Sequence, residues 1–266
     1  MKHFLLTCSL LLGLAGLGNA TPFREEDAVA RLFRAQQVNG TLAVYDTHSG
    51  TIAGYNGPRA VERFAPASTF KIAHSLIGLD TGTVSSVDEV FFHYDGQPAY
   101  LDTWKQDMNL RQAIAVSNLL AYQQLARQIG LKQERQQLAQ LQYGNAKTGK
   151  DVTTFWIDNT LRISAIEQTQ FLARLATGTL PYPAEQQAAV RDIVKLDSGS
   201  GWTLYGKTGW ATASKPGVGW FVGWLEREGH IYSFALNMQI DDASQLPQRV
   251  TLARQALAAL GLMTED

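Results

Sequence analysis

Segments rich in β-forming residues lie near both ends of this chain, and segments with helical periodicity fill the interval between them. The first two β-rich segments are joined by Thr47-His48-Ser49-Gly50, which predicts a hairpin. Strands from both termini around a helical insert predict an α+β fold, a mixed α/β sandwich. Its antiparallel sheet would be built from both chain ends, flanked by helices, and accompanied by an all-helical subdomain. The β-rich segments cover 41–46, 51–55, 202–205, 220–225 and 231–240.

Apolar residues at helical spacing place the remaining elements. Glu167 stands three residues after Ser164, which is the spacing of a capping box at the start of a helix. The predicted helices cover 21–37, 68–82, 110–116, 119–129, 131–141, a segment after Ser164, and 250–260.

The composition is that of an ordinary globular domain. Of 266 residues, 45% are apolar and 18% are charged, which is enough to bury one sizeable core, so we expect 21–266 to form a single domain. Lys and Arg total 23 and Asp and Glu total 24, which gives a net charge of -1, and no basic tract interrupts the mixture. This balance argues against a nucleic acid or an anionic membrane surface as a partner.

The first twenty residues have the layout of a secretory signal peptide. Lys2 gives a basic start, an apolar run covers 4–17, and the small residues Gly18 and Ala20 precede a cleavage point. The run is short for a membrane span and no later segment is long and apolar enough, so we expect no membrane insertion of the mature chain. Cys8, the single cysteine, lies inside this segment, which leaves the mature chain without a disulfide. An exported chain without cysteine predicts the bacterial periplasm.

The strongest chemical signal is Ser68-Thr69-Phe70-Lys71, the one place where a Ser precedes a Lys by three residues. On a helix this spacing puts the hydroxyl and the amine on one face. Lys71 could then accept the Ser68 proton if the charge of its amine were suppressed. The alternative is an N-capping serine followed by a solvated lysine.

A second signal, Lys-Thr-Gly, occurs at 147–149 and at 207–209. Lys207 follows a β-rich run and precedes another, so we expect this copy at a sheet edge, where Gly209 would let a substrate backbone approach. The copy at 147–149 has no preceding strand and is interpreted as a surface turn. A third signal, Ser117-Asn118-Leu119, lies between two predicted helices, where it could hold a hydroxyl over a cleft or form an ordinary N-cap.

Ser-x-x-Lys, a Ser-x-apolar loop and Lys-Thr-Gly, in this order, resemble the motif set of the penicillin-recognising serine enzymes. Over nearly its whole mature length the chain resembles their class D β-lactamases, the oxacillinases. This resemblance implies a serine β-lactamase/transpeptidase-like fold. The matching stretches are 66–71, 117–119, Tyr143-Gly144-Asn145, Phe155-Trp156, 161–165, 207–210, 219–224 and 246–249.

The resemblance implies that carbon dioxide carboxylates the Lys71 side chain to N6-carboxylysine, which acts as general base for acylation of Ser68 and for deacylation. Burial among apolar groups such as Phe70, Leu119 and Trp156 would favour the neutral amine that reacts with carbon dioxide. The indole N–H of Trp156 is the expected donor to the carbamate. No cofactor is expected beyond carbon dioxide or bicarbonate.

The resemblance also implies roles for other residues. The backbone amides of Ser68 and Trp210 would form an oxyanion hole, and Ser117 would pass a proton to the departing lactam nitrogen. The residues implied to hold the substrate carboxylate are Lys207, Thr208 and Arg249.

The implied activity is hydrolysis of penicillin-type antibiotics, which would confer resistance. One residue departs from the family pattern, because Leu119 stands where Val is usual, and its extra methylene could restrict deacylating water or shield the carbamate. The alternatives are a penicillin-binding DD-peptidase, in which this position is a polar Asn, and a non-hydrolysing β-lactam sensor domain, which would be tethered to a membrane helix. The sequence leaves open whether the protein is a monomer or a homodimer.

Two other catalytic readings are weaker. The scattered residues His48, His74, His93 and His230 lack the spacing of a zinc site, so no metal is expected, and His74 is interpreted as a packed or capping residue. Glu167 lies about as far after the serine as the deacylating Glu of class A enzymes, but the capping box explains it more simply.

Overall fold

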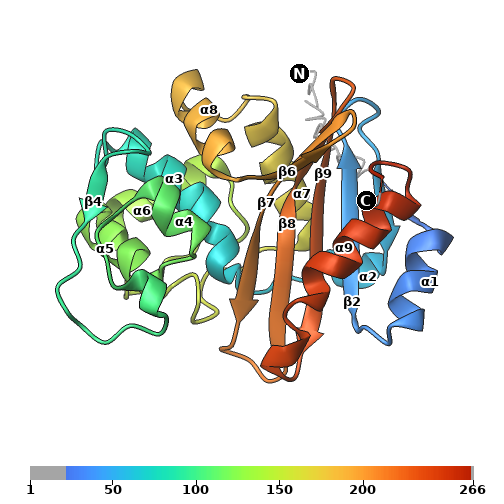
Figure 1. The fold of residues 1–266 in the computed structure, drawn as a ribbon, viewed down its shortest axis with the longest axis horizontal. Helices are drawn as coiled ribbons and strands as arrows, with labels where there is room; N and C mark the ends of the chain where they lie inside the picture. The colour runs from blue at the N-terminus through green and yellow to red at the C-terminus, as the bar shows by residue number, and fades with distance from the viewer. Residues whose placement is uncertain (1–21, 265–266) are drawn as a thin grey trace, which may run out of the picture.

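The computed structural model describes residues 22–264, so the predicted signal peptide at 1–20 lies outside the described residues. A seven-stranded sheet runs through the centre in the order β1-β3-β2-β9-β8-β7-β6 (Figure 1). Strands from the two chain ends meet where β2 pairs with β9, as the β-rich segments predicted. The strands of this sheet are β1 (Phe23–Glu25), β2 (Gly40–Asp46), β3 (Ile52–Tyr55), β6 (Lys195–Gly199), β7 (Trp202–Ala211), β8 (Gly217–Arg227) and β9 (His230–Ile240).

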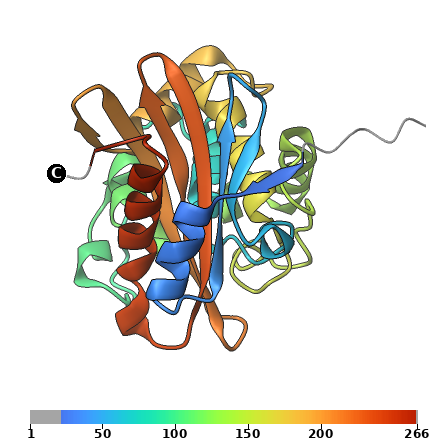
Figure 2. The same cartoon turned by 90° about the vertical axis from the view of Figure 1, so that its right-hand side faces the viewer.

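Helices cover both faces of the sheet, and a further group of helices stands beside it. Helices α1 (Asp27–Ala35) and α9 (Gln248–Ala259) lie together on one face, as Figure 2 shows, and α7 (Ala165–Ala176) packs on the other face against β2, β8 and β9. A further group of helices stands beyond β7 and also carries a small two-stranded sheet of β4 (Val90–Phe92) and β5 (Met108–Asn109) (Figure 1). The helices of this group are α3 (Lys71–Asp80), α4 (Leu110–Ala115), α5 (Leu119–Ile129) and α6 (Leu131–Leu141). The predicted helical subdomain is therefore not wholly helical.

The helical bounds agree closely with the periodicity in the middle of the chain, where α5 and α6 begin and end at the predicted residues. The predicted capping box is formed, because the Ser164 side chain accepts from Glu167 N–H and the Glu167 side chain accepts from Ser164 N–H. The α-helices are α1 (Asp27–Ala35), α2 (Gly57–Ala60), α3 (Lys71–Asp80), α4 (Leu110–Ala115), α5 (Leu119–Ile129), α6 (Leu131–Leu141), α7 (Ala165–Ala176), α8 (Ala184–Ile193) and α9 (Gln248–Ala259). The 3-10 helices are η1 (Ala67–Phe70), η2 (Asp102–Trp104) and η3 (Ala243–Gln245).

The N-terminal segment corrects the prediction of one helix over 21–37. β1 pairs in parallel with β3, and α1 begins only at Asp27. The backbone N–H of Glu26 donates to Gly54 O at 2.7 Å, which completes the junction between strand and helix. Pairing with a distant strand thus overrides the local helical pattern. The parallel pair also makes the sheet mixed rather than wholly antiparallel.

β7 is longer than predicted, and its two halves have different neighbours. β8 pairs with the whole of β7, but β6 pairs only with the first part, from Trp202 to Tyr205. The part that carries Lys207 and Gly209 therefore has one strand partner, and η1 packs against it. The expectation of a Lys-Thr-Gly element at a sheet edge holds for this half of the strand.

An ionisable pair lies inside the group of helices. His74 Nε2 on α3 lies 2.7 Å from Glu134 Oε1 on α6, and neither side chain has exposed surface. In the part of the chain that the structure describes, His74 Nδ1 and Glu134 Oε2 have no hydrogen-bond partner. The imidazole also contacts the rings of Phe70, Tyr122 and Trp156. His74 is a packed core residue.

Replacing His74 by Leu should lower the free energy of unfolding by about 3–5 kcal/mol, because the Glu134 carboxyl would be left buried without its partner. The double variant His74→Leu/Glu134→Leu should recover most of this loss, since both groups are then apolar. Urea unfolding followed by circular dichroism measures both effects. A double variant as unstable as the single one would contradict the pairing argument.

Candidate active site

Ser68 and Lys71 lie at the junction of η1 and α3, with the serine in the 3-10 turn and the lysine at the start of the α-helix. Lys71 Nζ lies 2.9 Å from Ser68 Oγ, within hydrogen-bond distance. Ser68 is partly exposed, whereas Lys71 is 1% exposed. The i, i+3 spacing thus brings an accessible hydroxyl against a buried amine.

The environment of Lys71 disfavours its charged form. Burial is the main cause that lowers its pKa well below the ordinary lysine value, and the nearby positive charge of Lys207 lowers it further. The amine lies over the ring of Tyr122, with Nζ 5.2 Å from the ring centroid. A neutral amine 2.9 Å from a hydroxyl can accept its proton or react with an electrophile.

Trp156 is fully buried and its indole Nε1 has no hydrogen-bond partner among the described residues. Its ring contacts those of Phe70 and His74, which precede and follow Lys71 on the same turn of the chain. Its carbonyl accepts from Ala67 N–H at 2.9 Å, which ties this segment to η1. A buried unpaired donor is costly, so a group with acceptor oxygens would fit here.

Two residues at the site have backbone conformations that only glycine adopts readily. Ala67, immediately before the serine, has φ 47°, and Ser117 has φ 56°. Such strain persists only when the surrounding structure fixes it, and it is frequent at functional sites. The sequence carried no signal for Ala67.

The Tyr143-Gly144-Asn145 element packs and forms hydrogen bonds next to the segment that holds Trp156. Tyr143 is buried against Phe70, and Asn145 accepts from Arg162 N–H at 3.0 Å. A side chain at Gly144, which has φ 53°, would lie 2.1 Å from Arg162 O. The element therefore supports the site without supplying a reacting group.

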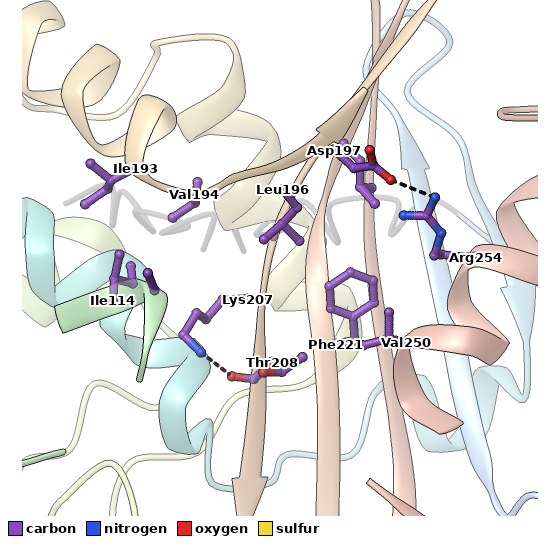
Figure 3. A pocket seen from close by; sticks show the side chains of 13 residues that line it. Ile114, Ile193, Val194, Leu196, Asp197, Lys207, Thr208, Phe221, Val250 and Arg254 are labelled. Carbon is purple, nitrogen blue, oxygen red and sulfur yellow. Dashed lines mark hydrogen bonds and ion pairs between the residues drawn. The ribbon is translucent and has the colours of Figure 1, made fainter. Parts of the chain in front are cut away.

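Lys207 lies on β7, and its side chain is largely buried, with 8% of the residue exposed. Burial first, and then the charge of Arg249, lower the pKa of Lys207 to about 7. Its Nζ donates to Thr208 O at 3.1 Å. Lys207 and Thr208 both line one cavity at this edge of β7 (Figure 3).

Gly209 has a packing role that the sequence did not predict. A Cβ at this position would lie 2.9 Å from Pro66 O and 3.2 Å from Thr69 N. The missing side chain therefore lets η1 pack against β7, which brings the Ser68 turn to the strand that carries Lys207. The structure shows this close approach of the protein's own backbone, and the approach of a substrate backbone stays a prediction.

Arg249 lies in the first turn of α9 and donates from Nη1 to Gly209 O at 2.7 Å. Burial lowers its pKa to about 10, and its Nε is buried without a partner in the described residues. The Trp210 side chain packs with the core on the α1 and α9 face, so it is turned away from the side on which Lys207 projects.

Ser117 and Leu119 flank the helix cap between α4 and α5. Asn118 is the N-cap, since its side chain accepts from Ala121 N–H at 3.1 Å, so the cap does not use the Ser117 hydroxyl. Among residues 22–264, no hydrogen bond joins Ser117 to Ser68, Lys71 or Lys207. Leu119 is half-buried against the core that contains Phe70 and Trp156.

Two residues that the sequence analysis set aside, Glu167 and Lys147, have no hydrogen bond or ion pair with Ser68 or Lys71 among the described residues. Glu167 forms its capping box and an ion pair with Arg63, and Lys147 is exposed in a loop. Within 22–264, no group of three or more His, Cys, Asp or Glu side chains could hold a metal ion. No helix in that range is both long and apolar enough to cross a membrane.

A comparison with protein-family models and a comparison with known protein sequences agree with each other. The model of the penicillin-binding protein transpeptidase domain matches residues 38–258. Beta-lactamase OXA-19 of Pseudomonas aeruginosa is 34% identical over 253 residues, which cover 94% of this chain and 95% of the relative. Beta-lactamase OXA-5 of the same species is 36% identical over 234 residues, which cover 87% of each chain.

Solved structures agree with these relatives. The crystal structure of FUS-1 (OXA-85), a class D β-lactamase from Fusobacterium nucleatum subsp. polymorphum, superposes with a TM-score of 0.89 at 42% identity. The match covers 91% of this chain and 100% of that chain. The family domain, the identity over nearly the full length and the shared fold bear out the resemblance of the motifs, and the chain belongs to the class D β-lactamases.

Proposed function

We propose that this enzyme hydrolyses the β-lactam ring of penicillin-type antibiotics through an acyl-enzyme on Ser68. The observation that carries the proposal is the buried Lys71 amine, whose Nζ lies 2.9 Å from the partly exposed Ser68 hydroxyl. A base that is uncharged because it is buried can activate this nucleophile at neutral pH. The activity would protect the bacterium that exports the enzyme to its periplasm.

The fully active base is Lys71 after carboxylation by carbon dioxide. Burial supplies the neutral amine that this reaction needs, and the unpartnered indole N–H of Trp156 supplies a donor for the added group. The added carboxylate would give Lys71 an oxygen that takes the Ser68 proton during acylation and a water proton during deacylation.

The strand β7 and the η1 turn would hold the substrate. The backbone amides of Ser68 and Trp210 would stabilise negative charge on the lactam carbonyl oxygen. The positive charge of Arg249 lowers the pKa of Lys207, and a substrate carboxylate bound between them would relieve this repulsion. Thr208 would add a hydroxyl donor to the same carboxylate.

Two residues near the α5 cap would complete the reaction. Ser117 has a hydroxyl that the cap leaves available, and it would deliver a proton to the departing lactam nitrogen. Leu119, packed against the core around Phe70, would exclude bulk water from the modified lysine and so set the rate of deacylation.

Removal of dissolved carbon dioxide should lower turnover of the chromogenic cephalosporin nitrocefin by at least about tenfold, and added bicarbonate should restore it, because the carbamate forms reversibly. Ser68→Ala should show no acyl adduct in intact-protein mass spectrometry, and Lys71→Ala should lose turnover. Lys147→Ala, which alters the exposed lysine of the second Lys-Thr-Gly element, is the control and should keep wild-type turnover.

A turnover rate that does not depend on bicarbonate would contradict the proposed role of carboxylated Lys71. Stoichiometric acylation of Ser68 without turnover would overturn hydrolysis and indicate a DD-peptidase or a sensor domain.

Trp156→Phe should raise the bicarbonate concentration for half-maximal activity by about 10- to 100-fold, because a hydrogen bond to a charged group is lost while an aromatic ring is kept. Trp224→Phe is the matched control, since Trp224 is equally buried but donates to Glu226 instead. An equal shift in both variants would show a general loss of packing. No shift in Trp156→Phe would exclude the indole as the donor.

The folded protein should become more stable relative to Lys207→Met as the pH rises from about 7 to about 10. Burial lowers the pKa of Lys207 to about 7, so the unfolded chain binds more protons at this group than the folded protein above that pH. The free energy of unfolding therefore increases with pH across this window. Urea unfolding of both proteins measures the difference, in which contributions from other groups largely cancel, and a difference independent of pH would contradict the assignment.

A further inference from the structure

The indole ring of Trp156 is held in its orientation by packing. The ring is fully buried, and its Nε1 has no hydrogen-bond partner in the part of the chain that the structure describes. Aromatic rings contact it, with centroid distances of 5.0 Å to Phe155, 5.2 Å to His74 and 6.0 Å to Phe70. A side chain without a hydrogen bond keeps its orientation only if the groups packed against it keep theirs. The neighbouring rings therefore determine where the Trp156 N–H points.

Of these neighbours, His74 is fixed by a hydrogen bond as well as by packing. Its Nε2 lies 2.7 Å from Glu134 Oε1, and neither side chain has exposed surface. The imidazole also contacts the ring of Tyr122, with 5.6 Å between the centroids. The Lys71 Nζ lies over the same Tyr122 ring. The imidazole thus contacts both the indole and the ring that borders the Lys71 amine.

We propose that His74, held by Glu134, is a positioning residue that keeps the Trp156 N–H directed at the carboxylated Lys71 side chain. The inference rests on the proposed function, in which Lys71 carries a carbamate and Trp156 donates to it. The imidazole meets the indole edge-on, at an interplanar angle of 64°, which is a favoured arrangement of aromatic pairs. This contact opposes rotation of the indole, and His74 itself transfers no proton.

A well-placed donor should favour the carbamate over the free amine. When the neutral Lys71 amine adds to carbon dioxide, a bond forms between Nζ and the carbon, one proton is released, and the product carries a negative charge. A hydrogen bond to a charged group is strong, but it weakens steeply when the donor is misaligned. Loss of the contact with His74 should therefore raise the bicarbonate concentration that is needed for half-maximal carboxylation.

The test separates the aromatic ring from the ion pair by means of two double variants. His74→Leu/Glu134→Leu removes the ring and leaves no buried carboxyl, whereas His74→Phe/Glu134→Leu keeps an aromatic ring beside Trp156. Each protein is titrated with ¹³C-bicarbonate, and the carbamate signal is followed by ¹³C NMR, which measures carboxylation without turnover. The half-maximal concentration should rise about tenfold in the first variant and stay within about threefold of wild type in the second.

Glu134→Gln keeps a hydrogen-bonding partner for the imidazole and should stay within about twofold of wild type. Tyr182→Phe is the control, because it removes a buried hydrogen bond to Gln137 on the same helix α6 and keeps every ring that contacts Trp156. It should leave the half-maximal concentration unchanged.

An equal rise in both double variants, or a tenfold rise in Glu134→Gln, would show that the ring contact does not position the indole. Carboxylation at the wild-type concentration in His74→Leu/Glu134→Leu would overturn the proposal as well. A wild-type protein without any carbamate signal would instead overturn the proposed carboxylation of Lys71, and this inference would fail with it.

Discussion

Burial of the Lys71 amine is the constraint on which the rest of the site depends. In water this amine would be protonated and could not take a proton from Ser68, whereas removal from water favours the neutral form. Both parts of the molecule act on the amine, because the ring of Tyr122 on α5 lies next to it and β7 brings the positive charge of Lys207 near it. The proposed chemistry therefore depends on the boundary between β7 and the group of helices, because residues from both sides surround the Lys71 amine.

This boundary is narrow because the backbones of η1 and β7 approach each other closely there. Gly209 lets η1 lie against β7, and Ala67 adopts a strained conformation that is tied by its N–H to Trp156 O. β6 stops short of this half of β7, so β8 is its only strand partner in the described residues. The half of β7 that meets the Ser68 turn is therefore the half that β6 leaves uncovered.

The sequence predicted long, periodic elements well and short or pairing-dependent ones poorly. The helices at 119–129 and 131–141 were predicted to the residue, because their apolar stripes are continuous and Gly130 separates them. β1 and β6 were missed, since each is a short strand defined by its partner rather than by its own composition. The pairing of His74 with Glu134 was equally hidden, because their contact joins residues that are 60 positions apart.

The site residues show the same division. The Ser68 and Lys71 contact follows from spacing on one turn, and the order of the motifs identified the family. The strained Ala67 and the packing role of Gly209 depend on tertiary contacts that no local pattern records. The central claim, that Lys71 is neutral and reacts with carbon dioxide, is tested most directly by ¹³C NMR of the protein equilibrated with ¹³C-bicarbonate. The account predicts one protein-bound carbamate signal in the wild type that is absent from Lys71→Ala, and a wild-type protein without that signal, or a variant that retains it, would contradict the account.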